Sequence, residues 1–75
     1  MATYNVGNLV TVKDVVKPVW LLNATAGNQM AVELARRPKS AEVFDTFGNS
    51  QGHVKAGRGL NRIAVPRSGY VKFEF

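Results

Sequence analysis

The sequence predicts an all-β domain, a small antiparallel β-sandwich or barrel of six to seven short strands. Apolar and polar residues alternate over short stretches such as Tyr70–Phe75 (YVKFEF), which is the two-residue period of a strand with one buried face. Glycine, proline and asparagine separate these stretches roughly every ten residues, a spacing typical of small sandwiches and barrels. No long stretch carries the period of a helix.

The length of 75 residues indicates one domain spanning 1–75, near the lower limit of chains that fold alone. Residues 1–8 are polar and contain glycine, so we expect an N-terminal arm or an edge segment there. The chain has no cysteine, which excludes disulfides and thiolate metal sites. Stability must therefore come from tight packing, oligomerisation or docking on a larger assembly.

Three strands are expected in the first half of the chain. Leu9–Lys13 (LVTVK) is rich in the β-branched residues that favour strands. Val19–Ala24 (VWLLNA) is the second, with Trp20 as its expected core anchor. Residues 25–28 contain a glycine and an asparagine and are predicted to form a hairpin loop. The third strand, Gln29–Ala35, follows this loop.

Gln29–Ala35 (QMAVELA) is the stretch where a helix competes most strongly with a strand. Met, Ala, Glu and Leu are all good helix formers. Against a helix, the large apolar residues alternate with smaller or polar ones, and Pro38 disfavours the α conformation at Arg37. We therefore predict a strand.

The second half of the chain is organised around a strand and turn. Glu42–Asp45 is predicted to be a strand that ends at Gly48-Asn49, where both residues tolerate a positive φ. Ser50–Lys55 (SQGHVK) is a weak strand, and Leu60–Val65 alternates as a strand does. At Pro66–Gly69 a turn is expected, with proline restricting φ and glycine supplying the positive φ.

The predicted core consists of large apolar residues from these strands. Such residues carry most of the burial that stabilises so small a domain. The residues expected to be buried are Trp20, Val32, Leu34, Val43, Phe44, Ile63, Val65, Val71 and Phe73.

No pattern of residues indicates catalysis. His53 is the only histidine, and no serine or acid is spaced from it as nucleophilic catalysis requires. Glu42 and Asp45 would lie on opposite faces of one strand, which does not suit a pair of catalytic carboxylates. We predict a noncatalytic protein with no cofactor and no metal, and an exposed or edge position for His53.

The chain is basic, with 10 Lys and Arg against 5 Asp and Glu, a net charge of +5. This charge favours polyanions or acidic protein surfaces as partners, although solubility explains it equally well. The candidate contacts for a polyanion or partner are Arg36, Arg37, Lys39, Lys55, Arg58, Arg62 and Arg67. The sequence shows neither a signal peptide nor an apolar run of membrane-spanning length. We therefore expect cytoplasmic synthesis and no membrane partner.

Two stretches carry resemblances to known families. Thr3-Tyr4-Asn5-Val6-Gly7-Asn8-Leu9-Val10, followed by Val12-Lys13-Asp14, resembles the start of small structural and tail proteins of tailed bacteriophages. That resemblance implies a virion component docked on a larger shell or tail. The order of apolar stretches from Val19 to Phe75 is similar to the small C-terminal β-sandwich of some glycoside hydrolases, which implies a noncatalytic accessory module.

These observations predict a noncatalytic structural or interaction protein. The leading hypothesis is a small bacteriophage virion subunit, either capsid-decorating or tail-associated, which contacts a protein partner or larger assembly and forms homo-oligomers. One alternative is a basic β-barrel that binds nucleic acid. Another is an accessory module of a carbohydrate-active enzyme.

Overall fold

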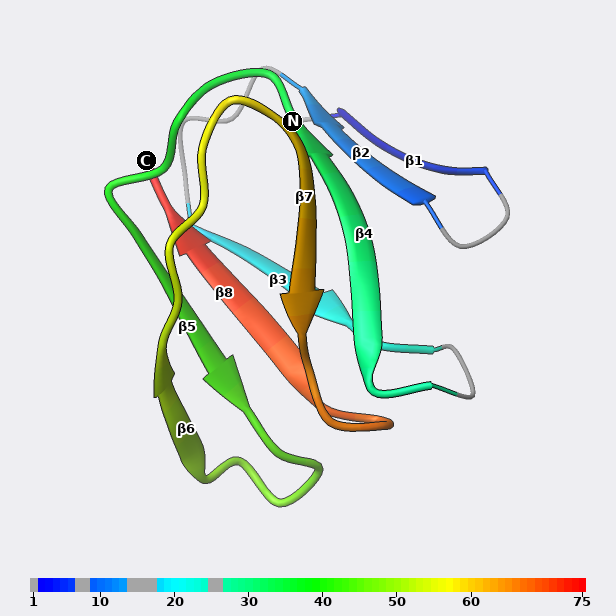
Figure 1. The fold of residues 1–75 in the computed structure, drawn as a ribbon, viewed down its shortest axis with the longest axis vertical. Helices are drawn as coiled ribbons and strands as arrows, with labels where there is room; N and C mark the ends of the chain where they lie inside the picture. The colour runs from blue at the N-terminus through cyan, green and yellow to red at the C-terminus, as the bar shows by residue number, and fades with distance from the viewer. Residues whose placement is uncertain (1, 7–8, 14–17, 25–26) are drawn as a thin grey trace.

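The structure is a computed structural model that describes residues 2–6, 9–13, 18–24 and 27–75. It confirms an all-β architecture, and the described residues contain no helix. Two four-stranded sheets make up the fold (Figure 1). In spatial order, the first sheet contains β1 (Ala2–Val6), β2 (Leu9–Lys13), β4 (Gln29–Leu34) and β7 (Gly59–Ala64). The second contains β3 (Val19–Leu22), β8 (Tyr70–Glu74), β5 (Ser40–Phe44) and β6 (Ser50–His53).

The first sheet differs from the predicted antiparallel arrangement at one pair of strands. β2 and β4 run parallel, with Leu9 opposite Ala31 and Val12 opposite Leu34. The strand between them in sequence, β3, lies in the second sheet, so the chain returns to the first sheet in its original direction. The eighth strand, beyond the six or seven predicted, is β1, which pairs with β2 at the edge of this sheet.

Residues 25 and 26 of the predicted hairpin loop at 25–28 lie outside the described residues, but the two strands that the loop would join do not pair, so the hairpin prediction is wrong. β3 pairs with β8, whereas β4 pairs with β2 and β7, so the connection from β3 to β4 crosses from one sheet to the other. Turn composition alone cannot distinguish a hairpin from such a crossing, because both need residues that reverse the chain. The strand prediction for β4 itself is confirmed, and its neighbours on both sides explain why helix propensity does not prevail.

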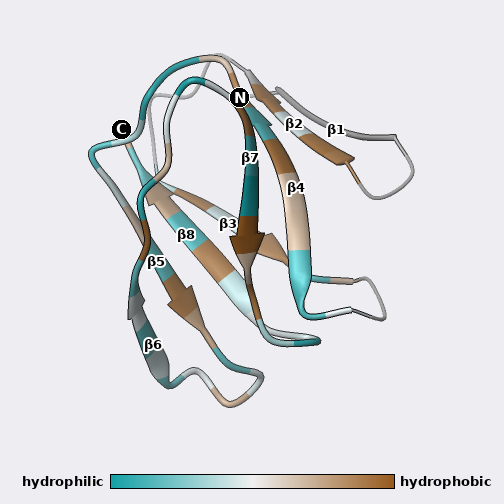
Figure 2. Cartoon of the chain, viewed as in Figure 1, coloured by the Kyte–Doolittle hydropathy of each residue, from teal (hydrophilic) through white to brown (hydrophobic). Residues whose placement is uncertain are grey.

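A single apolar core lies between the two sheets. The strands β3, β4, β5 and β8 alternate between buried and more exposed positions, and Figure 2 shows the matching change of hydropathy in brown and teal along β8. The buried apolar residues are Val12, Val19, Leu21, Met30, Val32, Leu34, Ala41, Val43, Ile63, Val65, Val71 and Phe73. Both sheets supply members, an arrangement consistent with a small β-sandwich.

Seven of the nine predicted core residues are buried, but Trp20 and Phe44 are not. Trp20 is 55% exposed because its neighbours in β3, Val19 and Leu21, occupy the inward-facing positions. Phe44 is half-buried for the same reason, since Ala41 and Val43 define the inner face of β5. Aromatic character favours burial, but the register of the strand decides which face each ring occupies.

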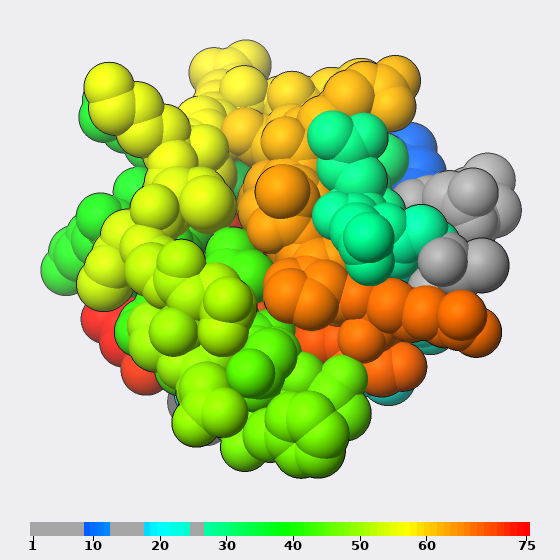
Figure 3. Space-filling model, turned by 60° about the horizontal axis from the view of Figure 1, so that its bottom comes forward, coloured from blue at the N-terminus to red at the C-terminus, as the bar shows by residue number. Residues whose placement is uncertain are grey.

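The turn at 66–69 forms where it was predicted, with a different residue in the unusual conformation. The N–H of Gly69 donates to the carbonyl of Pro66 at 2.8 Å, and the residue with positive φ is Ser68, at 62°, instead of Gly69. The turn lies beside residues 27–28 and the β5–β6 turn, seen in orange, turquoise and green in Figure 3. There the N–H of Arg67 donates a hydrogen bond to Asn28 Oδ1 at 3.2 Å.

None of the described residues belongs to a helix long and apolar enough to cross a membrane.

Candidate interaction surfaces

The predicted basic contacts are brought together in part. Arg37, Lys39 and Lys55 line one depression of about 480 Å³, although sixteen positions separate Lys39 from Lys55. Its walls are residues 37–41, which include the first two residues of β5, and residues 54–57, which follow β6. Both connections pass over the same end of the molecule in Figure 1. We call this feature the basic depression.

The other four predicted contacts lie outside the basic depression. Arg36 stands over the Phe75 ring at 5.6 Å from its centroid. Arg58 lines a neighbouring depression together with Glu33. Arg62 is on the solvent-facing side of β7, and Arg67 is in the turn between β7 and β8. All seven cations are exposed, but only Arg37, Lys39 and Lys55 share one depression.

The outer face of the second sheet carries a different kind of surface. The strand registers place Leu22, Tyr70 and Phe44 side by side across β3, β8 and β5. In the next row, Trp20 lies opposite Lys72, and Lys72 lies opposite Glu42. The sheet therefore presents an apolar row beside a row in which Lys72 lies between Trp20 and Glu42.

Exposed apolar side chains gather at one end of this face. Trp20, Leu22 and Tyr70 are 55%, 49% and 37% exposed. The Trp20 and Phe44 rings are 5.2 Å apart, and together with Tyr70 and Gly48 they line a depression of about 460 Å³. We call Trp20, Leu22, Phe44 and Tyr70 the aromatic patch. Lys72 Nζ lies 5.3 Å from the Trp20 ring centroid, in a cation–π contact.

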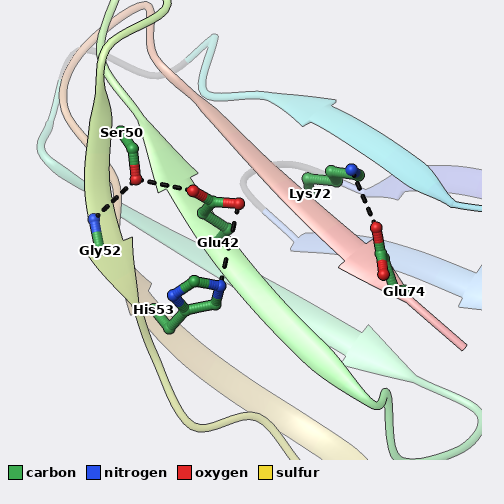
Figure 4. Close-up of polar contacts among 6 residues, drawn as sticks. All are labelled: Glu42, Ser50, Gly52, His53, Lys72 and Glu74. Atoms are coloured by element: carbon green, nitrogen blue, oxygen red, sulfur yellow. Dashed lines mark hydrogen bonds and ion pairs between the residues drawn. The ribbon is translucent and has the colours of Figure 1, made fainter.

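Polar side chains next to the aromatic patch are held in place by one another, as Figure 4 shows. Ser50 Oγ donates to Glu42 Oε2 at 2.7 Å, and His53 Nε2 lies 3.8 Å from Glu42 Oε1. Lys72 Nζ lies 2.9 Å from Glu74 Oε1. The hydrogen bond and positive charge of Lys72 lower the pKa of Glu74. Both ion pairs are surface pairs, whose contribution to stability is small.

Serine, glutamate and histidine meet here, but in an order that does not suit nucleophilic catalysis. A nucleophilic serine must bond to the histidine, and the acid must orient that histidine from its other side. Here Glu42 lies between Ser50 and His53 and contacts both. His53 is exposed on the edge strand β6, as predicted. Among the described residues, no group of three or more His, Asp or Glu side chains is placed to hold a metal ion.

No protein-family model, curated protein or solved structure matches this chain.

The aromatic patch is the surface that sequence reasoning missed. Residue type predicts that Trp20 and Phe44 belong to the core, whereas their positions in the strands place them on the face opposite to Val19, Leu21 and Val43. A strict two-residue count in each strand would have placed both rings on the outer face. This count cannot predict that the two rings lie close together. Their contact depends on the position of β8 between β3 and β5.

Proposed function

We propose that the protein is a noncatalytic structural subunit that assembles with further copies of itself through the outer face of its second sheet. The observation that carries the proposal is the exposure of the aromatic patch. A cluster of exposed aromatic and apolar side chains on a small soluble domain is typical of an interaction surface. Aromatic residues also supply much of the binding free energy where proteins associate.

The charges on this face favour a second copy of the chain as its binding partner. With a net charge of +5, two copies repel each other in most orientations. On the outer face of the second sheet, however, Lys72 is accompanied by Glu42 and Glu74. In a two-fold dimer, each contact occurs twice: if a first residue of one copy contacts a second residue of the other copy, the reverse contact forms as well. Lys72 of each copy would then face Glu42 of the other, with the aromatic patches in contact.

The setting that we propose is the virion of a tailed bacteriophage, as a capsid-decorating or tail-associated subunit. Its support is the resemblance of residues 3–14 to small structural proteins of such phages. β1 overlaps that stretch and is an edge strand, and an unpaired edge is a common point of assembly. For the fold, we infer a sandwich instead of a closed barrel, because β6 and β7 are the edges of separate sheets.

The self-association is tested with two leucines of similar exposure on different sheets. Leu22 belongs to the aromatic patch and is 49% exposed, whereas Leu60 is 57% exposed on β7 of the first sheet. We expect Leu22→Ser to weaken the association measured by sedimentation equilibrium by about tenfold, roughly the effect of 1.4 kcal/mol. Leu60→Ser is the matched control and should leave the association unchanged. Equal effects of the two substitutions, or a wild-type monomer at millimolar concentration, would contradict the proposal.

A charge exchange tests the two-fold arrangement itself. Lys72→Glu and Glu42→Lys should each weaken the association, because like charges would then face each other across the interface. The double variant restores opposite charges and should regain most of the affinity. Trp20 is the only tryptophan, so its emission reports contact at the patch directly. If the double variant associates no better than either single one, the partner surface is not a second copy in this orientation.

A further inference from the structure

The basic depression concentrates positive charge in a way that the self-association does not explain. The two connections at this end, 35–39 and 54–58, hold five of the ten Lys and Arg residues of the chain and no Asp or Glu. Arg37, Lys39 and Lys55 line the depression itself. Among the described residues, no Asp or Glu lines it.

The backbone that carries these cations is held at several points. The N–H of Lys39 donates to the Glu74 carbonyl at 2.6 Å, and the N–H of Val54 donates to the Ala41 carbonyl at 2.9 Å. The Asn61 side chain makes two hydrogen bonds to the backbone of Gly57. It accepts from the Gly57 N–H at 3.0 Å and donates to the Gly57 carbonyl at 2.8 Å. Both walls of the depression are therefore attached to strands, so a ligand would not have to order them.

None of the three cations belongs to an ion pair in the described part of the chain, where the ion pairs join His53 to Glu42 and Lys72 to Glu74. The hydrogen bond and charge of Lys72 lower the pKa of Glu74 most, and the charge of Lys39 lowers it further. The carboxylate of Glu74 is engaged by Lys72 at 2.9 Å. Three like charges around one depression repel one another, and an anion bound between them would relieve that repulsion.

We propose that the basic depression binds phosphate groups of a nucleic-acid backbone, without reading its base sequence. Arg37 offers the planar fork of donors that matches a phosphate, and Lys39 and Lys55 add compact charges. The aromatic patch lies on a different surface, so it supplies no stacking platform for bases at this site. Contacts to phosphates alone give affinity that depends on salt but not on sequence.

The proposal is tested by salt titration with a fluorescently labelled DNA duplex. Three phosphate contacts predict that the association constant falls about 40-fold between 50 and 200 mM salt, from a slope of about 0.9 per contact. Arg37→Gln/Lys55→Gln removes two contacts, and the same change in salt should then weaken binding only about 4-fold. Arg62→Gln/Arg67→Gln is the matched control, because it lowers the net charge by the same amount outside the depression.

The control decides between a site and a general effect of charge. We expect the control variant to keep the wild-type salt slope, with circular dichroism showing that both variants are folded. The proposal is overturned if both double variants flatten the slope equally, or if the wild-type protein does not bind the duplex at 50 mM salt. It is also overturned if duplexes of different sequence bind with widely different affinities.

Two competitors of the labelled duplex distinguish a nucleic-acid ligand from free phosphate and from an acidic protein. Inorganic phosphate, added at constant ionic strength, should displace the duplex only at far higher concentration than unlabelled DNA, because it occupies one contact at a time. Polyglutamate tests for an acidic protein partner, since its carboxylates carry charge without phosphate geometry. Displacement by polyglutamate at the same charge concentration as DNA would show a site for acidic proteins and would reject the nucleic-acid ligand.

Discussion

Gly69 shows how closely single residues are constrained at the β7–β8 turn. Its φ is not positive, so its importance does not come from a left-handed backbone. Instead, a Cβ at this position would overlap the Phe44 carbonyl oxygen and lie 2.9 Å from that of Pro66. The turn is attached to the end of β3 through Asn23, which is fully buried and donates its side-chain amide to the Val65 carbonyl at 2.9 Å.

Substitution of Gly69 should therefore destabilise the fold through a steric overlap. We expect Gly69→Ala to lower the free energy of unfolding by about 1–3 kcal/mol, the usual range for overpacking. Gly27→Ala is the control, because an added Cβ there meets no atom of the described residues within 4 Å. Urea unfolding of both variants measures the difference. A Gly69→Ala protein as stable as Gly27→Ala would show that the turn can move away from β5 at little cost.

Among the elements, the β5–β6 hairpin depends on the carboxylate of one partly exposed residue, Asp45. Asp45 Oδ1 accepts hydrogen bonds from the N–H groups of Phe47 and Asn49, both at 2.9 Å. The bond from Asn49 is the largest cause of a lowered pKa at Asp45, because these donors favour the charged carboxylate. Gly48 provides the positive φ of the turn, at 84°, as predicted.

The lowered pKa of Asp45 makes the stability of this hairpin depend on pH. Because the pKa is lower in the folded state, the carboxylate stabilises the fold above its unfolded pKa of about 3.9. That stabilisation is lost as the pH falls through the folded pKa. We expect wild type to melt above Asp45→Asn at pH 7, and the gap in melting temperature to shrink below about pH 4. A gap that is the same at pH 7 and pH 2.5 would show that the charge of Asp45 has no part in it.

At the scale of the whole molecule, stability depends on one shared core. Phe73 is fully buried in β8, the strand that lies between β3 and β5. Its ring also contacts Phe75, with centroids 6.4 Å apart. Without disulfides, and with 75 residues, few other contributions can replace it.

Truncation of Phe73 should remove about half of the stability of the domain. We expect Phe73→Ala to cost about 3–5 kcal/mol, as is usual for a buried aromatic ring. The total for a chain of 75 residues is about 7.5 kcal/mol, at about 0.1 kcal/mol per residue. Phe47→Ala is the control, because Phe47 is 88% exposed and should change stability by less than about 0.5 kcal/mol. Thermal unfolding of both variants distinguishes a core residue from a surface one. An unchanged melting temperature for Phe73→Ala would contradict its place in the core.

The sequence alone determined that the protein is built from short strands, and it placed most of them correctly. Alternation in β4, β7 and β8 identified the buried positions of those strands, because side-chain direction in a strand depends only on local geometry. The same count, applied strictly, would have moved Trp20 and Phe44 to the surface. The seven candidate basic residues were likewise visible from composition and spacing alone.

Only the tertiary structure decided which strands are neighbours and which surfaces they create. The parallel pairing of β2 with β4, the crossing from β3 to β4 and the position of β8 between β3 and β5 are all non-local. So is the meeting of Lys39 with Lys55 around one depression. Local patterns fix the face of a strand but not its partner, because pairing depends on how residues far apart in sequence bury a common core.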